Sequence, residues 1–194
     1  MGELIVTEFV TVDGVMEAPG GEPTHPHTGW VADFMGEEQL AFKFQEVLDA
    51  DAQLIGRVTY ESFAGAWPYR TGEFADRMNA MPKYVVTRTL DELEWNNSTP
   101  IRGDVAEDVA KLKQQDGGPI LVAGSRLLVH FLLDHDLVDE LRLMVFPVLL
   151  GSGLRLFPER RDETSLALTD TRTFATGVQV NTYRPVSRQA PPAA

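Results

Sequence analysis

Residues 54–63 read LIGRVTYESF, and in this stretch a strand, a glycine and a helix follow one another directly. The apolar run that ends at Ile55 predicts a strand buried on both faces. Arg57 comes straight after Gly56, at the start of a helix predicted over 57–64. A cation at that point either reaches solvent or holds a negatively charged group, because a helix start favours anions.

The same order of strand and helix continues along the chain. Apolar or β-branched runs bounded by Gly, Pro and Asp predict strands near 3–11, 52–56, 83–88, 119–123, 140–149, 164–170 and 176–184. Helical spacing predicts helices near 31–48, 57–64, 72–80, 105–115 and 125–134. We therefore expect an α/β fold, a three-layer α/β/α sandwich with a mixed, mostly parallel central sheet. A single domain is expected over 1–186, followed by a flexible tail over 187–194.

The composition excludes several classes of protein. The 194 residues carry a net charge of −12, which repels polyanions and argues against a nucleic-acid-binding protein. The chain contains no cysteine, so disulfides and thiolate metal sites are excluded. Neither an apolar run of about 18 residues nor a secretion signal is visible, so we expect a cytoplasmic protein with no membrane partner.

Three predicted strands run into an arginine beside a small or hydroxyl residue, at Arg57, Arg88 and Arg126. Ligands of parallel α/β sheets bind beyond the carboxyl ends of the strands, where helix starts offer free amides to phosphate. Gly56 and Gly124 would let the backbone approach a pyrophosphate closely. The arrangement suits a dinucleotide, although neither GxGxxG nor GxxxxGK[ST] occurs. Taken singly, each arginine is more simply explained as a surface residue paired with one of the 29 carboxylates, and only the three together favour a ligand.

Five motifs, in one order, resemble those of the dihydrofolate reductase superfamily. They are TVDGVMEAPG (11–20), IGRVTYESFAGAWP (55–68), KYVVTRTL (83–90), GGPILVAGSRLL (117–128) and LVDELRLMVFPVLLGSGLRLF (137–157). More narrowly, the chain resembles stand-alone relatives of the reductase domain at the C-terminus of the bifunctional riboflavin-biosynthesis deaminase/reductase. The resemblance implies a dihydrofolate-reductase-like fold, NADPH as cofactor, a small heterocyclic substrate and a homodimer.

The resemblance also implies which residues hold the cofactor. The phosphate side would be met by the first turn of the 57–64 helix, and the 2′-phosphate by the end of the 83–88 strand. The expected cofactor-binding residues are Gly56, Arg57, Val58, Thr59, Thr87, Arg88, Gly124, Ser125, Arg126 and Leu127.

Two acidic residues are candidates for the catalytic role. In dihydrofolate reductases an acid on the first helix anchors the pterin; counted back from Gly56, that position falls at Leu40, and Glu38 is the nearby candidate. Riboflavin-pathway reductases carry a small–Leu–Asp–Gly motif after the first strand, which TVDG resembles, and this favours Asp13. Glu38 is more simply explained as an ordinary helix-start acid, and Asp13 is equally explained as part of a turn.

For the substrate, the flat side chains of Trp30, Phe34 and Tyr60 and the cation Arg155 are candidates, with core packing the alternative for the aromatics. The Gly- and Pro-rich segment 17–30 is expected to act as a lid. His25 and His27 lack a supporting ligand cluster, so no metal is expected. The function expected is an NADPH-dependent reductase resembling 5-amino-6-(5-phosphoribosylamino)uracil reductase. A dihydrofolate or pteridine reductase and a non-catalytic NADPH- or ligand-binding module are the alternatives.

Overall fold

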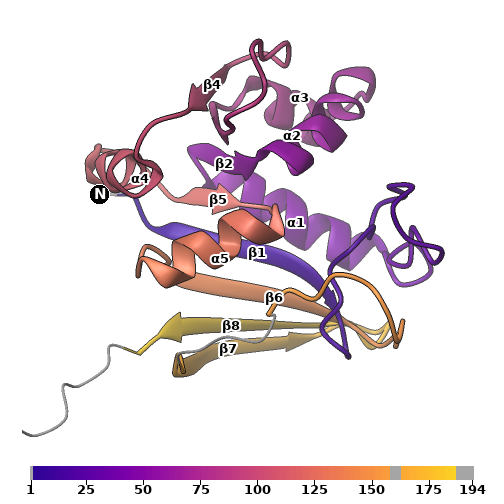
Figure 1. Ribbon diagram of the computed structural model, residues 1–194. Helices are drawn as coiled ribbons and strands as arrows, with labels where there is room; N and C mark the ends of the chain where they lie inside the picture. Colours follow the sequence, from indigo (N-terminus) through magenta and orange to yellow (C-terminus); the bar gives the residue numbers. More distant parts are fainter. Residues whose placement is uncertain (1, 158–162, 187–194) are drawn as a thin grey trace, which may run out of the picture.

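The computed structural model describes residues 2–157 and 163–186, so the tail expected over 187–194 lies outside the described residues. The described chain forms one eight-stranded sheet in the order β4-β3-β2-β5-β1-β6-β8-β7 (Figure 1). The strands are β1 (Leu4–Thr11), β2 (Ala52–Gly56), β3 (Lys83–Val86), β4 (Ser98–Ile101), β5 (Ile120–Val122), β6 (Glu140–Phe146), β7 (Leu166–Thr173) and β8 (Gln179–Pro185). The first six strands of this order, β4, β3, β2, β5, β1 and β6, are parallel to one another. Strand β8 pairs antiparallel with β6 and with β7. The expected mixed, mostly parallel sheet is confirmed.

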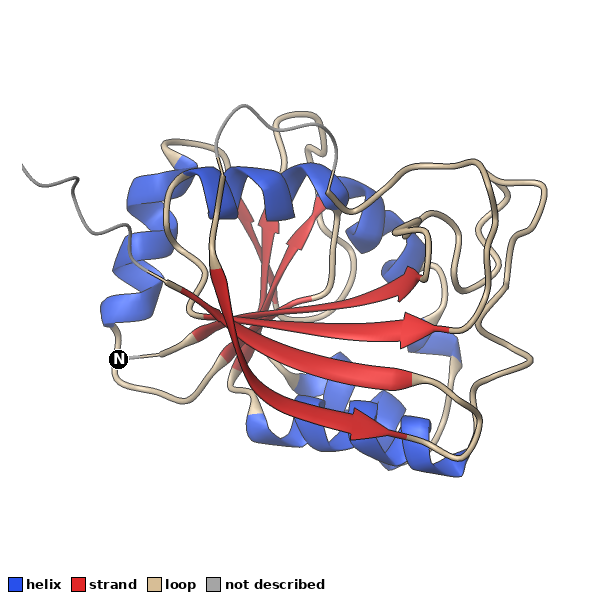
Figure 2. Cartoon of the chain, turned by 90° about the horizontal axis from the view of Figure 1, so that it is seen from below, coloured by secondary structure: helices blue, strands red, loops and turns tan. Residues whose placement is uncertain are grey.

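Helices lie on both sides of the sheet (Figure 2). They are α1 (Glu37–Asp49), α2 (Arg57–Ala64), α3 (Glu73–Ala80), α4 (Val105–Gln114) and α5 (Arg126–Asp134), with a short 3-10 turn, η1 (Trp67–Tyr69). Alternation along β1 separates two cores. Leu4, Val6 and Val10 pack in the cluster that contains the buried residues of α4 and α5. Ile5 packs in the cluster that contains Val47 of α1, Tyr60 of α2 and Met78 of α3.

Several predicted elements differ from the structure in their bounds, and two of the differences have a clear physical reason. The helix expected from residue 31 begins at Glu37, because 30–34 form turns and the carboxamide of Gln39 folds back to accept a hydrogen bond from Gly36 N. The strand expected to reach 149 ends at Phe146, since Pro147 has no amide to donate to the ladder.

Strand β4 was missed by the sequence analysis. Its sequence, STPI, contains Pro100, which argues against a central strand. The strand lies at the edge of the sheet, where one side of the backbone needs no partner. Its omission matters for the site, because β4 ends beside β3 at the edge where the candidate cofactor residues lie.

Candidate functional site

The ends of β2 and β5 are packed closely together at the carboxyl edge of the sheet. Gly56 N donates a hydrogen bond to Gly124 O at 3.2 Å. A Cβ atom on Gly56 would lie 2.2 Å from Ser125 Oγ, and one on Gly124 would lie 2.6 Å from Thr59 Oγ1. Gly124 also has a positive φ of 78°. Both positions therefore require glycine, so that the two strand-to-helix turns can lie side by side.

Helices α2 and α5 begin directly after these glycine turns. Their N-caps, Gly56 and Ser125, are extended, and neither supplies a side-chain hydrogen bond to the first helical turn. The amides of the first turn and the positive end of each helix dipole thus remain suited to an anion. Arg57 and Arg126 are the first helical residues and add formal positive charge. The structure brings together the two turns that the sequence predicted to hold phosphate.

The side chain of Arg57 is 46% exposed and lies 3.0 Å from the carboxylate of Glu61, one helical turn later. Exposed pairs at this spacing contribute only about 0.3–0.5 kcal/mol. The guanidinium can therefore exchange Glu61 for another anion at little cost. The surface pairing weighed in the sequence analysis is present, and it does not prevent a second role.

A further group of cations lies at the ends of β3 and β4. Arg88 is exposed, whereas Thr87 is buried and its Oγ1 accepts hydrogen bonds from Thr89 N and Leu90 N. The Thr87 hydroxyl thus shapes the turn that presents Arg88. Arg102 follows β4 at the neighbouring position of the sheet and donates to the carbonyl oxygen of Leu90. The sequence analysis missed Arg102 because it missed the strand that carries it.

Glu8 is a buried carboxyl group within the central strand β1, and sequence reasoning did not single it out. It is 6% exposed, and its Oε1 accepts a hydrogen bond of 2.6 Å from Gly124 N. Burial raises the pKa of Glu8 to about 8, opposed by the Gly124 hydrogen bond and the charge of Lys43. The sequence contained a signal for this residue. Glu8 lies on the same face of the predicted strand as Val6 and Val10, which point into the core.

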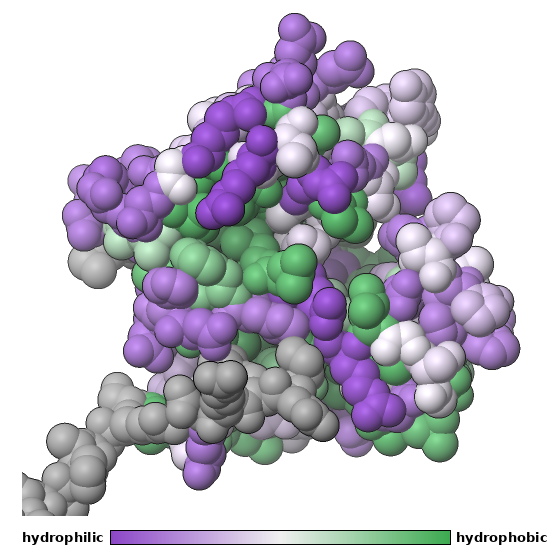
Figure 3. Space-filling model, in the orientation of Figure 1, coloured by the Kyte–Doolittle hydropathy of each residue, from purple (hydrophilic) through white to green (hydrophobic). Residues whose placement is uncertain are grey.

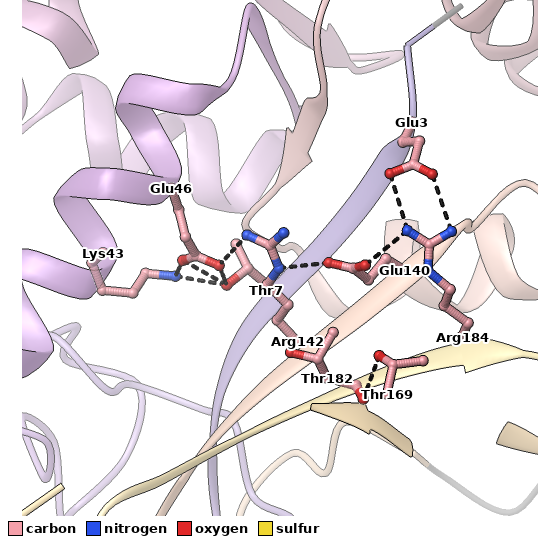
Figure 4. Close-up of polar contacts among 9 residues, drawn as sticks. All are labelled: Glu3, Thr7, Lys43, Glu46, Glu140, Arg142, Thr169, Thr182 and Arg184. Atoms are coloured by element: carbon pink, nitrogen blue, oxygen red, sulfur yellow. Dashed lines mark hydrogen bonds and ion pairs between the residues drawn. The ribbon is translucent and has the colours of Figure 1, made fainter. Parts of the chain in front are cut away.

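On the other side of β1, polar residues of α1 face the sheet. Gln39, Lys43 and Glu46 recur at helical spacing, and the Glu46 carboxylate accepts hydrogen bonds from Thr7 Oγ1 and Arg142 (Figure 4). Lys43 Nζ lies 2.5 Å from Glu46 Oε2. The network continues through ion pairs from Arg142 to Glu140, from Glu140 to Arg184 and from Arg184 to Glu3. Charges on this face are thereby balanced within the protein.

The acid expected on the first helix, Glu38, is not buried at the start of α1. Glu38 is exposed in the first turn of α1. Its neighbour Gln39 is 1% exposed, accepts a hydrogen bond from Gly36 N at 3.1 Å and donates to Thr176 Oγ1. This face of the helix start thus presents an amide to the interior, and the catalytic role expected for Glu38 stays a prediction.

Asp13 links two loops. Its carboxylate accepts hydrogen bonds from Thr11 Oγ1 at 2.5 Å, Gly151 N at 2.8 Å and Leu150 N at 3.3 Å. The Thr11 hydrogen bond is the largest of the effects that hold the pKa of Asp13 below its ordinary value. Asp13 is therefore ionised at neutral pH and ties the turn after β1 to the loop after β6. This geometry favours the turn interpretation, while its catalytic role stays a prediction.

The aromatic candidates separate into two places. Trp30 and Phe34 surround Phe146, with ring centroids 5.3 and 6.2 Å away. Tyr60 instead belongs to the core cluster under α2, where its hydroxyl accepts a hydrogen bond from Trp95 N at 3.0 Å. The structure therefore brings Trp30 and Phe34 together but places Tyr60 in another cluster.

The segment 17–30 contacts both sides of the carboxyl edge. Ser62 of α2 donates to Glu22 Oε1 at 3.2 Å, and His25 Nε2 lies 3.3 Å from Ser152 Oγ. Arg155, the expected substrate cation, is exposed and forms a β-bridge with Val15. Figure 3 shows a hollow between this part of the chain and the apolar surface over α5. The segment thus lies at that edge, and its role as a lid stays a prediction.

Within 2–157 and 163–186, no three His, Asp or Glu side chains are grouped so that they would hold a metal ion. The helices of this part of the chain are all too short or too polar to cross a membrane.

The parallel sheet, with two glycine turns and two helix starts at one edge, defines an α/β protein of the dihydrofolate-reductase-like class. The chain belongs to the RibD C-terminal domain family, which matches residues 3–180. The predicted family is thus confirmed. This chain is 31% identical, over 180 residues, to the uncharacterized protein YwjB of Bacillus subtilis (strain 168). The alignment covers 90% of this chain and 94% of YwjB.

Three solved structures share the fold. A putative riboflavin biosynthesis protein from Shewanella sp. PV-4 gives a TM-score of 0.66 at 20% identity, covering 95% of this chain and 99% of the other. A diaminohydroxyphosphoribosylaminopyrimidine deaminase/5-amino-6-(5-phosphoribosylamino)uracil reductase from Thermotoga maritima gives 0.65 at 15% identity, covering 95% of this chain and 57% of that one. A dihydrofolate reductase from Enterococcus faecalis, complexed with NADP(H) and RAB-propyl, gives 0.57 at 18% identity, covering 96% and 98%.

Proposed function

We propose that this protein is an NADPH-dependent reductase that transfers a hydride to a pyrimidine- or pterin-like small molecule. The observation that carries the proposal is the packing of Gly56 against Ser125 and of Gly124 against Thr59, which sets two uncapped helix starts side by side. A pyrophosphate fits this arrangement, because it needs close backbone approach and several N–H donors. Membership of a reductase family supports the same function.

Different residues at the carboxyl edge of the sheet would bind different phosphates of NADPH. The first turns of α2 and α5, with Arg57 and Arg126, would hold the pyrophosphate, while the exposed Arg88 would hold the 2′-phosphate. Arg102, which follows the neighbouring strand β4 and contacts the carbonyl oxygen of Leu90, would add a second cation. A guanidinium binds a phosphate in a forked geometry, which favours NADPH over NADH. The chemistry supplied by bound NADPH is transfer of a hydride to the substrate.

The substrate would lie beyond β1, under the segment 17–30. Phe34, half-buried beside Phe146, would add an apolar surface there, whereas Trp30 is buried in the core. Closure of the segment would exclude water from the reacting atoms. In dihydrofolate reductases the first helix supplies an acid to the pterin, whereas the buried polar group at the start of α1 is Gln39. The buried acid of this helix, Glu46, is already paired with Lys43 and Arg142. This difference favours a pyrimidine such as the substrate of 5-amino-6-(5-phosphoribosylamino)uracil reductase over dihydrofolate.

Calorimetry with NADPH and NADH, followed by loss of absorbance at 340 nm with each candidate substrate, tests the proposal. Selective NADPH binding and turnover of the ribosylaminopyrimidine phosphate are expected. Turnover of dihydrofolate alone would favour the pteridine alternative, and binding without turnover would favour a ligand-binding module. Absence of NADPH binding would overturn the proposal.

A further inference from the structure

The carboxyl group of Glu8 contacts the glycine turn between β5 and α5. Its Oε1 accepts a hydrogen bond of 2.6 Å from Gly124 N, and a Cβ on Gly124 would lie 3.9 Å from the same oxygen. Glu8 is 6% exposed, so water screens its charge poorly. A negative charge on Glu8 therefore acts directly on the turn that is suited to bind an anion.

Few charges surround this carboxyl group in the described chain. Lys43 of α1 is the cation that acts on it, but Lys43 is itself paired with Glu46 at 2.5 Å. On the β6 side, the residue in register with Glu8 is the apolar Leu143. The neighbouring elements thus leave an ionised Glu8 incompletely compensated.

The helices at this edge add two further charged groups. Helix α2 begins with Arg57, which is paired with Glu61, and α5 begins with Arg126. No hydrogen bond or ion pair links either arginine to Glu8 among the described residues. Both lie at the site where an anionic ligand would compete for them.

We propose that Glu8 is a positioning residue that binds a proton when an anionic dinucleotide occupies the 124–127 turn. The inference rests on the proposed NADPH site and concerns its regulation by pH. A bound pyrophosphate and an ionised Glu8 would repel each other across a single backbone amide. With a proton from solvent on Oε2, Oε1 still accepts the hydrogen bond from Gly124 N, so the turn keeps its shape while the repulsion disappears.

The pKa of about 8 gives the sign and the range of the effect. Below pH 8 Glu8 is already mostly protonated, so NADPH binding takes up few protons from solution. Above pH 8 binding must draw a proton from solution, so NADPH affinity falls by up to about tenfold per pH unit. Proton uptake should be about half a proton per site at pH 8 and should approach about one at pH 9.

The test measures NADPH binding to the full chain by calorimetry at pH 7, 8 and 9, in buffers that differ in ionisation enthalpy. Wild-type protein should show proton uptake that rises over this range and a dissociation constant that rises with it. In Glu8→Gln, which keeps the shape without the charge, both effects should vanish. Glu140→Gln removes another buried carboxylate, at the start of β6 and in register with Ile5 rather than Glu8, and should behave as wild type.

The possible outcomes distinguish failure of this inference from failure of the proposed function. Binding without proton uptake in wild type, or uptake that persists in Glu8→Gln, would overturn this inference and leave the proposed function intact. Absence of NADPH binding at every pH would overturn both. Should Glu8→Gln fail to fold, the wild-type proton count alone supports or refutes the inference.

Discussion

Gly56 and Ser125 approach each other so closely that a Cβ on Gly56 would lie 2.2 Å from Ser125 Oγ and 3.1 Å from Ser125 N. The two residues are far apart in the chain, yet they are the N-caps of the two helices that meet at the carboxyl edge. This contact makes one anion site from two separate strand-to-helix turns. A substitution at either residue therefore tests whether this anion site binds NADPH.

The substitution Gly56→Ala should abolish this close approach. The new methyl group must push the 125 turn away, because backbone as well as side chain lies in its path. NADPH binding should weaken at least about tenfold, since a shift of about 1 Å disrupts several amide contacts together. Gly65→Ala, at the other end of α2, meets no atom closer than 3.4 Å and should bind NADPH normally. Equal affinities in the two variants would contradict the site.

Arg88→Ala should reduce the preference for NADPH over NADH. Loss of a forked arginine–phosphate contact costs about 1.5–3 kcal/mol, or about 10- to 100-fold in NADPH affinity, with little effect on NADH. Arg102→Ala should produce a smaller change of the same kind. The measurement is the ratio of the two dissociation constants. Lys111→Ala removes the same charge from the exposed face of α4 and should leave the ratio unchanged.

Glu8 should make the stability of the free protein depend on pH. Its pKa rises from 4.5 to about 8 on folding, so the folded state retains a proton that the unfolded state releases between these values. The stabilising contribution is full below pH 4.5 and is lost as pH rises toward 8, by up to about 1.4 kcal/mol per pH unit. The free energy of unfolding of Glu8→Gln, measured in urea, should therefore exceed that of wild type increasingly from pH 5 to pH 8. A difference that is constant with pH would refute this assignment.

Tyr60→Phe distinguishes a structural role from a substrate contact. The substitution leaves Trp95 N, which donates to the Tyr60 hydroxyl, without its partner in a buried cluster. We expect a loss of about 1–3 kcal/mol in the free energy of unfolding and an unchanged KM for the substrate. Tyr69→Phe changes an 83% exposed side chain and should alter neither. A raised KM without loss of stability would restore Tyr60 as a substrate residue.

Much of the architecture was predictable because it rests on local patterns. The buried run ending at Gly56 and the run ending at Val122 read as strands, and the residues after them as helix starts. The two glycines were identified as points of close backbone approach for the same reason. Strand β4 failed this reasoning, because Pro100 is acceptable only at a sheet edge and the edge is a property of the whole sheet.

The candidate site divides in the same way. The sequence alone determined the family and the order of strands and helices except β4, since these follow from short-range spacing and motif order. It also indicated the cations Arg57, Arg88 and Arg126, whose role in binding stays a prediction. Only the tertiary structure decided that Glu8 lies against Gly124 and that Arg102, after β4, contacts Leu90 in the turn after β3. The physical reason is that the pKa of a carboxyl group and the neighbours of a guanidinium depend on burial and strand order, which distant parts of the chain determine together.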